Sequence, residues 1–216
     1  MIKILSKVFE TLFNVLFKRG VKNFFCEIKD LLFIDFRFKS LTFLRSNDKK
    51  QIYVPYYSCI LKKNIKTFLK EKKINDTYFV DLGSGKGRVL LGLSDLNFKK
   101  LIGVEKNKFF FKESSKYIKK NFLSTKIEIL NKDLINFNYN FTKNSNLVFF
   151  WYGVGSKILL KKIFVNFKKK FKDNKIFFYI IPEDNIPKDL KNIKVLFTFR
   201  DFKNDLSRNS KIITLL

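Results

Sequence analysis

The clearest structural signal in the chain is the segment Val80-Asp81-Leu82-Gly83-Ser84-Gly85-Lys86-Gly87-Arg88. A hydrophobic strand runs into Asp81, and three glycines at alternate positions then open the next helix. Glycine is needed where the backbone must turn tightly and come close to a ligand, because a Cβ atom there would collide with it. The segment therefore predicts a strand, a ligand-binding turn and a helix, in that order.

Strands and helices alternate around this turn. Short apolar runs predict strands at 78–82, 101–105, 126–130, 146–151, 175–181, 193–200 and 211–216. Apolar residues at helical spacing predict helices at 57–70, 87–96, 107–122 and 156–171. Alternation of this kind gives a mostly parallel sheet with helices on both faces. The predicted fold class is therefore α/β, with a doubly wound, mostly parallel, seven-stranded sheet.

Two known glycine-rich motifs do not fit the turn. The dinucleotide-binding fingerprint has its third glycine where Arg88 stands, and the phosphate-binding P-loop has Ser or Thr where Gly87 follows Lys86. Neither motif therefore explains the glycines. At the start of a helix, we expect Lys86 and Arg88 to be surface cations rather than catalytic groups.

Two acidic residues at strand ends accompany the turn. Glu105 ends the next strand, where an acid can accept hydrogen bonds from both hydroxyls of a ribose. Asp133 follows the third strand. Taken singly, Glu105 is explained equally well as a solvated strand-end residue, and Asp133 as a turn or helix-cap residue. The turn and both acids at this spacing argue against coincidence and indicate a nucleoside-binding site.

The pattern D-x-G-x-G-x-G resembles motif I of class I S-adenosylmethionine-dependent methyltransferases. Over residues 51–216 the chain is similar to small bacterial members with a Tyr-x-Pro box, here Tyr53-Val54-Pro55, and with a Gly-Val-Glu strand end, here Gly103-Val104-Glu105. It is less similar to the single-domain lysine methyltransferases of membrane carrier and ATP-synthase subunits. The resemblance implies an enzyme with a Rossmann-like fold and S-adenosylmethionine as its cofactor. It implies cofactor contacts from Asp81, Gly83, Ser84 and Gly85 to the methionine part, from Glu105 to the ribose, and from Asp133 with Leu134 to the adenine. Gly87 is also among the cofactor-binding residues that it implies.

Aromatic residues are the candidates for the acceptor site, because the chain contains no histidine. They are Tyr53, Tyr56, Trp151 and Tyr152, which can desolvate an amine or hold its cation by cation–π attraction. Each is explained equally well as an ordinary core or rim aromatic.

The segment after the fourth strand bears on the choice of acceptor. It reads Phe150-Trp151-Tyr152-Gly153-Val154-Gly155 and lacks the Asn/Asp-Pro-Pro-Tyr/Phe motif of methyltransferases that act on base amino groups. The favoured acceptor is therefore a protein lysine or another amine, including a small molecule. A nucleic-acid (RNA) methyltransferase and a non-catalytic nucleotide-binding scaffold stay open as alternatives.

The charge balance is strongly basic, with 45 Lys plus Arg against 19 Asp plus Glu and a formal net charge of +26. Such a charge favours polyanionic partners. The chain also has 28 Phe and no alanine, a bias typical of AT-rich genomes, so part of the charge reflects composition. The absence of histidine excludes imidazole chemistry, and two cysteines supply neither a disulfide framework nor a four-cysteine metal site. No metal is expected.

Residues 1–50 are predicted to be an amphipathic helical extension of the methyltransferase domain at 51–216, with a polar hinge at 46–51. Helices are expected over 1–17 and 21–33, and an alternating, extended segment over 34–45. No secretory signal or membrane-spanning run is recognisable, which predicts a cytoplasmic protein. The helices either pack on the domain or lie on an anionic membrane through residues 1–33.

Overall fold

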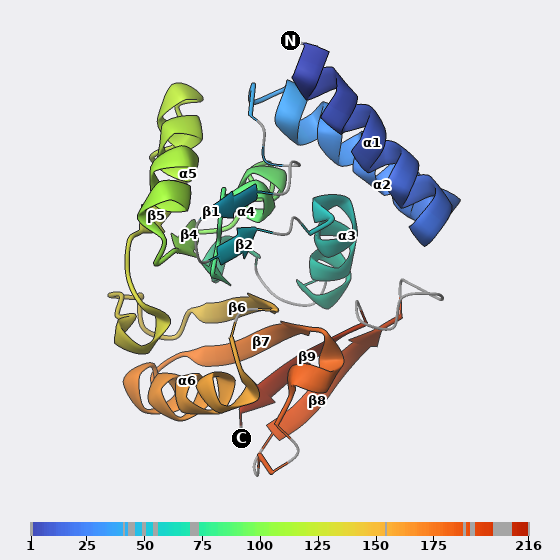
Figure 1. Ribbon diagram of the computed structural model, residues 1–216. Helices are drawn as coiled ribbons and strands as arrows, with labels where there is room; N and C mark the ends of the chain where they lie inside the picture. The colour runs from blue at the N-terminus through green and yellow to red at the C-terminus, as the bar shows by residue number, and fades with distance from the viewer. Residues whose placement is uncertain are drawn as a thin grey trace.

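A seven-stranded sheet forms the centre of the molecule (Figure 1). The structure is a computed structural model that describes residues 2–40, 42, 46–48, 51–53, 56–69, 74–153, 155–187, 189–190, 193–200 and 209–215. The strand order in the sheet is β5-β4-β3-β6-β7-β9-β8. This arrangement confirms the predicted α/β fold with a doubly wound sheet.

The first five strands of that order run parallel, and β9 is antiparallel to both of its neighbours. The strands are β3 (Thr77–Leu82), β4 (Lys100–Val104), β5 (Ile127–Leu130), β6 (Asn146–Tyr152), β7 (Lys175–Ile181), β8 (Ile193–Phe199) and β9 (Ser210–Leu215). A separate hairpin joins β1 (Ser46–Asp48) to β2 (Gln51–Tyr53). In the register of the large sheet, Leu82 lies between Val104 and Trp151. The carboxyl ends of β3, β4 and β6 therefore meet at one edge of the sheet.

The helices agree with the sequence expectations except in two places. The α-helices are α1 (Ile2–Arg19), α2 (Val21–Asp30), α3 (Ser58–Leu69), α4 (Arg88–Gly92), α5 (Lys108–Lys120) and α6 (Lys157–Lys170). The 3₁₀-helices are η2 (Ile74–Asp76), η3 (Leu134–Asn136) and η4 (Glu183–Asn185). The helix expected over 87–96 is shorter, because α4 ends at Gly92 and turns follow.

The extended segment expected over 34–45 is wrong where the structure describes it. Leu31–Phe36 forms a π-helix, η1, that continues α2 without a break. Ile34 and Asp35 are adjacent yet both are buried, so the alternation of apolar and polar residues does not mark two faces of a strand. Residues 41 and 43–45 lie outside the described residues.

Each face of the sheet carries its own hydrophobic core. On one face, α3, α4 and α5 pack over side chains such as Phe79 and Phe150. On the other face, α6 and η3 pack over Val80, Phe149 and their neighbours. A parallel strand covered on both faces reads as a continuous apolar run, which is why β3 and β6 were recognisable in the sequence. The two cores leave the carboxyl ends of the strands as the place for polar loops.

The N-terminal helices form a pair beside this sheet (Figure 1). Helix α1 packs along α2, and α2 with η1 contacts α3 and α4. The domain boundary placed between residues 50 and 51 stays a prediction. In the part of the chain that the structure describes, no helix has the length and apolar character needed to cross a membrane.

Candidate functional site

The glycine-rich turn joins β3 to α4 in a backbone conformation that requires its glycines. Gly83, Gly85 and Gly87 have φ angles of +88°, +52° and +78°, all in the left-handed region that favours glycine. The backbone N–H groups of Gly83 and Ser84 donate to the carbonyl oxygen of Val104 at 2.8 and 3.1 Å. The turn is thus tied to the end of β4, beside Glu105.

Glu105 is held in place by the backbone on both sides. Its Oε2 accepts a hydrogen bond from the Gly85 N–H at 2.8 Å, and its Oε1 accepts one from the Asn107 N–H at 2.7 Å. Burial raises the pKa of Glu105, and these hydrogen bonds oppose the increase. Each carboxylate oxygen can accept two hydrogen bonds, so the capacity to receive the two hydroxyls of a ribose remains. The position predicted from the sequence therefore fits a nucleoside.

Asp81 is a buried carboxyl group at the end of β3. Burial raises the pKa of Asp81 to about 8, and the nearby Glu105 carboxylate adds to the increase. At neutral pH most of this side chain is therefore protonated. A cationic group bound beside it would stabilise the ionised form and lower the pKa again.

Ser84 carries a buried hydroxyl group beside the turn. Its Oγ makes no hydrogen bond to any residue in the part of the chain that the structure describes. The neighbouring strand approaches so closely that a Cβ atom on Gly103 would lie 2.7 Å from this Oγ and 2.5 Å from Cδ1 of Ile129. Gly103 is therefore a further requirement of the turn. A bound ligand with a hydrogen-bonding group would satisfy the Ser84 hydroxyl.

Asp133 lies on the same side as Glu105 and is linked to it through Lys106. The Asp133 carboxylate caps η3 by accepting from the Ile135 N–H at 3.1 Å, and it pairs with Nζ of Lys106 at 2.7 Å. These contacts hold the pKa of Asp133 below its usual range. Leu134 is buried next to it. The structure therefore brings the three predicted parts, the turn, Glu105 and Asp133, to one edge of the sheet.

Sequence reasoning missed Lys106 and Asn131 at this edge. The side-chain amide of Asn131 donates to the carbonyl oxygens of Glu105 and Lys106 at 2.8 and 3.1 Å. It thereby fixes the loop after β5 against the loop after β4. For Lys106, the sequence offered one indication of a role at this site, which is its position directly after Glu105 at the end of the strand.

The predicted acceptor-site aromatics fall on two sides of the sheet. Tyr56 and Tyr152 meet on the face covered by α3, with ring centroids 4.9 Å apart. Trp151 is buried in the opposite core, and its Nε1 has no hydrogen-bond partner among the described residues. Tyr53 lies in β2, and its side chain is outside what the structure describes. Tyr56 and Tyr152 therefore form a pair, whereas Trp151 is separated from them by the sheet.

Arg88 and Lys86 are not surface cations, so that prediction is wrong. The Arg88 side chain is only 2% exposed, and Lys86 is also buried. Nη2 of Arg88 lies 3.2 Å from Oε1 of Glu27, and its Nη1 lies 2.5 Å from Oδ2 of Asp35. The acids that bury Arg88 come from α2 and η1, more than fifty residues earlier in the chain, and local sequence patterns carry no information on such a pairing.

A third carboxyl group, Asp30, completes this cluster around Arg88. Its Oδ2 lies 3.7 Å from the guanidinium, and its two oxygens accept from the N–H groups of Ser58 and Cys59 at 2.6 and 3.0 Å. Burial raises the pKa of Asp30 to about 7, against the opposing effect of Arg88. The cluster links the N-terminal helices both to α3 and to the first residue after the glycine-rich turn.

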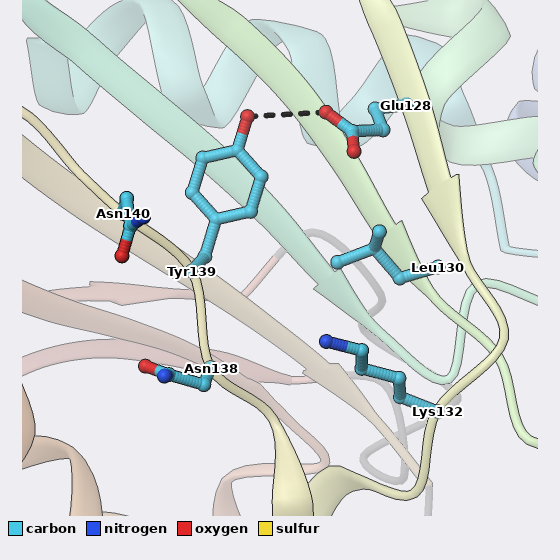
Figure 2. Close-up of a pocket in the computed structure, with 6 residues that line it drawn as sticks. All are labelled: Glu128, Leu130, Lys132, Asn138, Tyr139 and Asn140. Atoms are coloured by element: carbon cyan, nitrogen blue, oxygen red, sulfur yellow. Dashed lines mark hydrogen bonds between the residues drawn. The ribbon is translucent and has the colours of Figure 1, made fainter.

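A polar recess lies at the β5 edge of the sheet, next to Asp133 in the sequence (Figure 2). It has a volume of about 460 Å³ and is lined by Glu128, Leu130, Lys132, Asn138, Tyr139 and Asn140. The Tyr139 hydroxyl donates to Glu128 at 3.1 Å, and burial with the nearby carboxylate raises the pKa of Tyr139 to about 12. Tyr139 is therefore a stable hydrogen-bond donor at neutral pH. In the described residues, no group of three or more acids and cysteines is placed to hold a metal ion.

The fold is that of class I methyltransferases, as comparison with solved structures shows. No protein-family model matches the sequence, and no curated protein matches it. Magnesium protoporphyrin IX methyltransferase from Synechocystis PCC 6803, solved with bound S-adenosylmethionine, superposes with a TM-score of 0.56 at 10% identity, over 87% of this chain and 94% of that one. The Escherichia coli protein yhhF, provisionally assigned as a methyltransferase, gives a TM-score of 0.56 at 12% identity over 72% and 85% of the two chains. HI0767 from Haemophilus influenzae, provisionally assigned as a methylase, gives 0.55 at 14% over 74% and 98%.

Proposed function

We propose that this protein is an S-adenosylmethionine-dependent methyltransferase whose acceptor is an amine, with a protein lysine as the favoured one. The observation that carries the proposal is the position of Glu105, which the Gly85 N–H holds against a turn of three left-handed glycines. The similar fold of a methyltransferase solved with bound S-adenosylmethionine supports the same cofactor here.

In this proposal, each part of the cofactor is contacted by different residues of the site. Glu105 accepts hydrogen bonds from the ribose hydroxyls, and Asp133 accepts one from the amino group of the adenine. Ser84 and Asp81 face the methionine end, where the positive charge of the α-amino group favours the ionised form of Asp81. When bound, the cofactor would supply a methyl group on a positively charged sulfur: as a neutral amine nitrogen bonds to the methyl carbon, the carbon–sulfur bond would break and the sulfur would leave as a neutral thioether.

The acceptor side of the proposal rests on Tyr56 and Tyr152. Their rings meet at the carboxyl end of β6, the edge of the sheet to which Glu105 and the turn belong. An amine among aromatic rings loses water, and desolvation disfavours the ammonium form relative to the neutral, nucleophilic amine. Alignment of a neutral amine and exclusion of water supply much of the acceleration in such a displacement. No imidazole base is required.

A nucleic-acid acceptor is the second candidate, and the net charge of +26 is the observation that favours it. Against it stands the segment after β6, which has neither the Asn nor the Pro residues of the motif found in base-amino methyltransferases. A scaffold that has the fold without the activity is the third reading, and cofactor binding separates it from the other two.

Transfer of a labelled methyl group tests the proposal. The purified chain is incubated with methyl-labelled S-adenosylmethionine and two acceptor pools, a nuclease-treated protein extract and a protease-treated RNA extract. We expect label in the protein pool, on lysine by mass spectrometry, and we expect Glu105→Ala to abolish it. Glu128→Gln is the matched control, because Glu128 is an acid on the adjacent strand that contacts Tyr139 instead of the turn.

Each alternative outcome has a distinct meaning. Label in the RNA pool identifies a nucleic-acid acceptor and overturns the amine assignment. Cofactor binding without label in either pool directs the search to small-molecule amines and contradicts the preference for protein lysine. Absence of cofactor binding by folded protein supports the scaffold.

A further inference from the structure

The second N-terminal helix, α2, and its π-helical continuation, η1, bury several polar side chains and expose several apolar ones. Their buried polar residues are Asn23, Glu27, Asp30 and Asp35. Their exposed apolar residues are Val21, Phe25, Leu32, Phe33 and Phe36. An ordinary surface helix has the opposite arrangement, with its apolar stripe against the core. Here the acids must face inward to reach Arg88, and the apolar side of the helix is consequently directed away from the domain.

Helix α1, which packs along α2, also carries exposed apolar side chains. Val15 is buried on the side that faces the protein, whereas Phe9, Phe13 and Phe17 are between 64% and 73% exposed and follow one another at four-residue steps on the opposite side. The rings of Phe13 and Phe17 contact each other at 4.3 Å. We call the eight exposed side chains the outer apolar face: Phe9, Phe13, Phe17, Val21, Phe25, Leu32, Phe33 and Phe36. They belong to α1, α2 and η1, and Figure 1 shows α1 and α2 side by side next to α3.

Basic residues outnumber acidic ones in the same segment. Residues 2–39 contain eight basic residues, Lys3, Lys7, Lys18, Arg19, Lys22, Lys29, Arg37 and Lys39. They contain four acids, of which Glu27, Asp30 and Asp35 are buried around Arg88. Glu10 is thus the one acid of this segment outside the cluster, and Lys29, Arg37 and Lys39 are exposed. The side chains of the other five basic residues lie outside what the structure describes. The segment thus combines exposed apolar side chains with three exposed cations, Lys29, Arg37 and Lys39, and an overall excess of basic residues.

We propose that the outer apolar face docks on an anionic lipid bilayer. Exposed aromatic side chains on a helix flanked by Lys and Arg are the features of helices that lie in the membrane interface, with the apolar side chains in the acyl boundary and the cations at the headgroups. Docking of a second copy on the same face would bring together two segments that each have an excess of basic residues, and like charges disfavour that contact. An anionic bilayer matches both the exposed phenylalanines and this excess of basic residues.

The proposal also orients the enzyme. The Arg88 cluster joins α2 and η1 to the residue that follows the glycine-rich turn, so a bilayer under the outer apolar face lies at a fixed angle to the carboxyl ends of the strands. Membrane docking does not depend on the proposed methyl transfer, and it can be tested on protein without cofactor.

Vesicle flotation of the full chain tests the docking. The probes are vesicles of phosphatidylcholine alone and vesicles with about 30% phosphatidylglycerol. We expect at least about tenfold more protein bound to the anionic vesicles, with binding reduced by added salt. The triple variant Phe9→Ser/Phe13→Ser/Phe17→Ser should lose about tenfold or more of this binding. The double variant Ile158→Ser/Val165→Ser, which removes exposed apolar residues from α6, should bind as the parent does.

Because the replaced side chains are exposed, we expect the variants to fold as the parent does, and circular dichroism with thermal unfolding checks this. A second readout is Phe13→Trp, whose emission should shift to the blue on anionic vesicles, while Trp151 is buried and unaffected. Equal binding by the folded triple variant and the parent, or no blue shift at position 13, would overturn the proposal. Concentration-dependent dimers that the triple variant abolishes would identify a second copy as the occupant instead.

Discussion

The same side chain occupies opposite environments in the two parts of this molecule. In the sheet, Phe149 of β6 is fully buried against α6, whereas Phe13 of α1 is 64% exposed on the helix pair. The sheet buries most of its apolar residues, whereas α1, α2 and η1 together bury three acids and expose most of their phenylalanines. A count of 28 phenylalanines therefore says little about which region is core. The position of the acids' partner, Arg88, decides the orientation of the second helix.

The two regions also differ in what holds them. The sheet is stabilised by burial of apolar surface on both faces, which adds up over many side chains. The helix pair is joined to it in part through one guanidinium and three carboxyl groups. A buried ionic cluster gives little net stability compared with apolar packing, but removal of one partner leaves uncompensated charge and is costly. The junction is thus specific and sensitive to a single substitution.

Replacement of one phenylalanine in each region measures most directly how much a buried and an exposed phenylalanine contribute to the free energy of unfolding. Phe149→Ala should destabilise the protein by about 3–5 kcal/mol, because it opens a cavity in the core. Phe13→Ala should change the free energy of unfolding by less than about 0.5 kcal/mol, as expected for an exposed site. Urea unfolding followed by circular dichroism gives both values. Similar losses for the two variants would show that Phe13 is buried in the folded protein and would end the contrast.

Removal of the Arg88 charge breaks the junction between the regions. We expect Arg88→Met to cost about 3–5 kcal/mol, because three buried carboxyl groups lose their counter-charge. Hydrogen exchange should show the largest loss of protection in α2 and η1. Arg37→Met is the control, since Arg37 is exposed over the ring of Phe38, and a change below about 1 kcal/mol is expected there. An Arg88 variant as stable as the parent would contradict the role of the cluster.

The pH dependence of stability tests the buried acids. The pKa values of Asp81 and Asp30 are raised to about 8 and about 7, so the folded state holds protons that the unfolded state has released above pH 4. Their contribution to stability is therefore greatest at low pH and decreases as pH rises from about 4 to about 8. We expect a loss on the order of 6 kcal/mol between pH 5 and pH 8, measured by urea unfolding. Asp81→Asn should flatten the profile, and an unchanged slope would remove Asp81 as its source.

The sequence predicted the parts of the molecule that local patterns determine. The glycines at 83, 85 and 87 predicted the turn because each needs a left-handed φ angle, and the apolar runs predicted the strands because both faces of the sheet are covered. Because the apolar runs located β4 and β5, the sequence also placed Glu105 and Asp133 correctly, directly after β4 and in the loop after β5.

Contacts between distant segments could not be predicted in this way. The burial of Arg88 could not be predicted, because its acidic partners are Glu27, Asp30 and Asp35 and no periodicity in the sequence links those positions to the turn. Alternating apolar and polar residues around Ile34 and Asp35 predicted a strand, because an acid is expected on an exposed face. In the π-helix, however, Asp35 is buried next to Ile34. The aromatic residues Tyr56 and Tyr152 were singled out by type alone, and only the fold shows that their rings meet while Trp151 lies across the sheet.

Calorimetric titration with S-adenosylmethionine, and in parallel with S-adenosylhomocysteine, tests the central claim that the turn and Glu105 form a cofactor site. We predict micromolar binding of both compounds by the parent and by Glu128→Gln. Glu105→Ala should weaken binding by more than about tenfold, because charge-assisted hydrogen bonds to the ribose are lost. Undetectable binding by folded parent protein, or equal affinity in the parent and Glu105→Ala, would contradict the account.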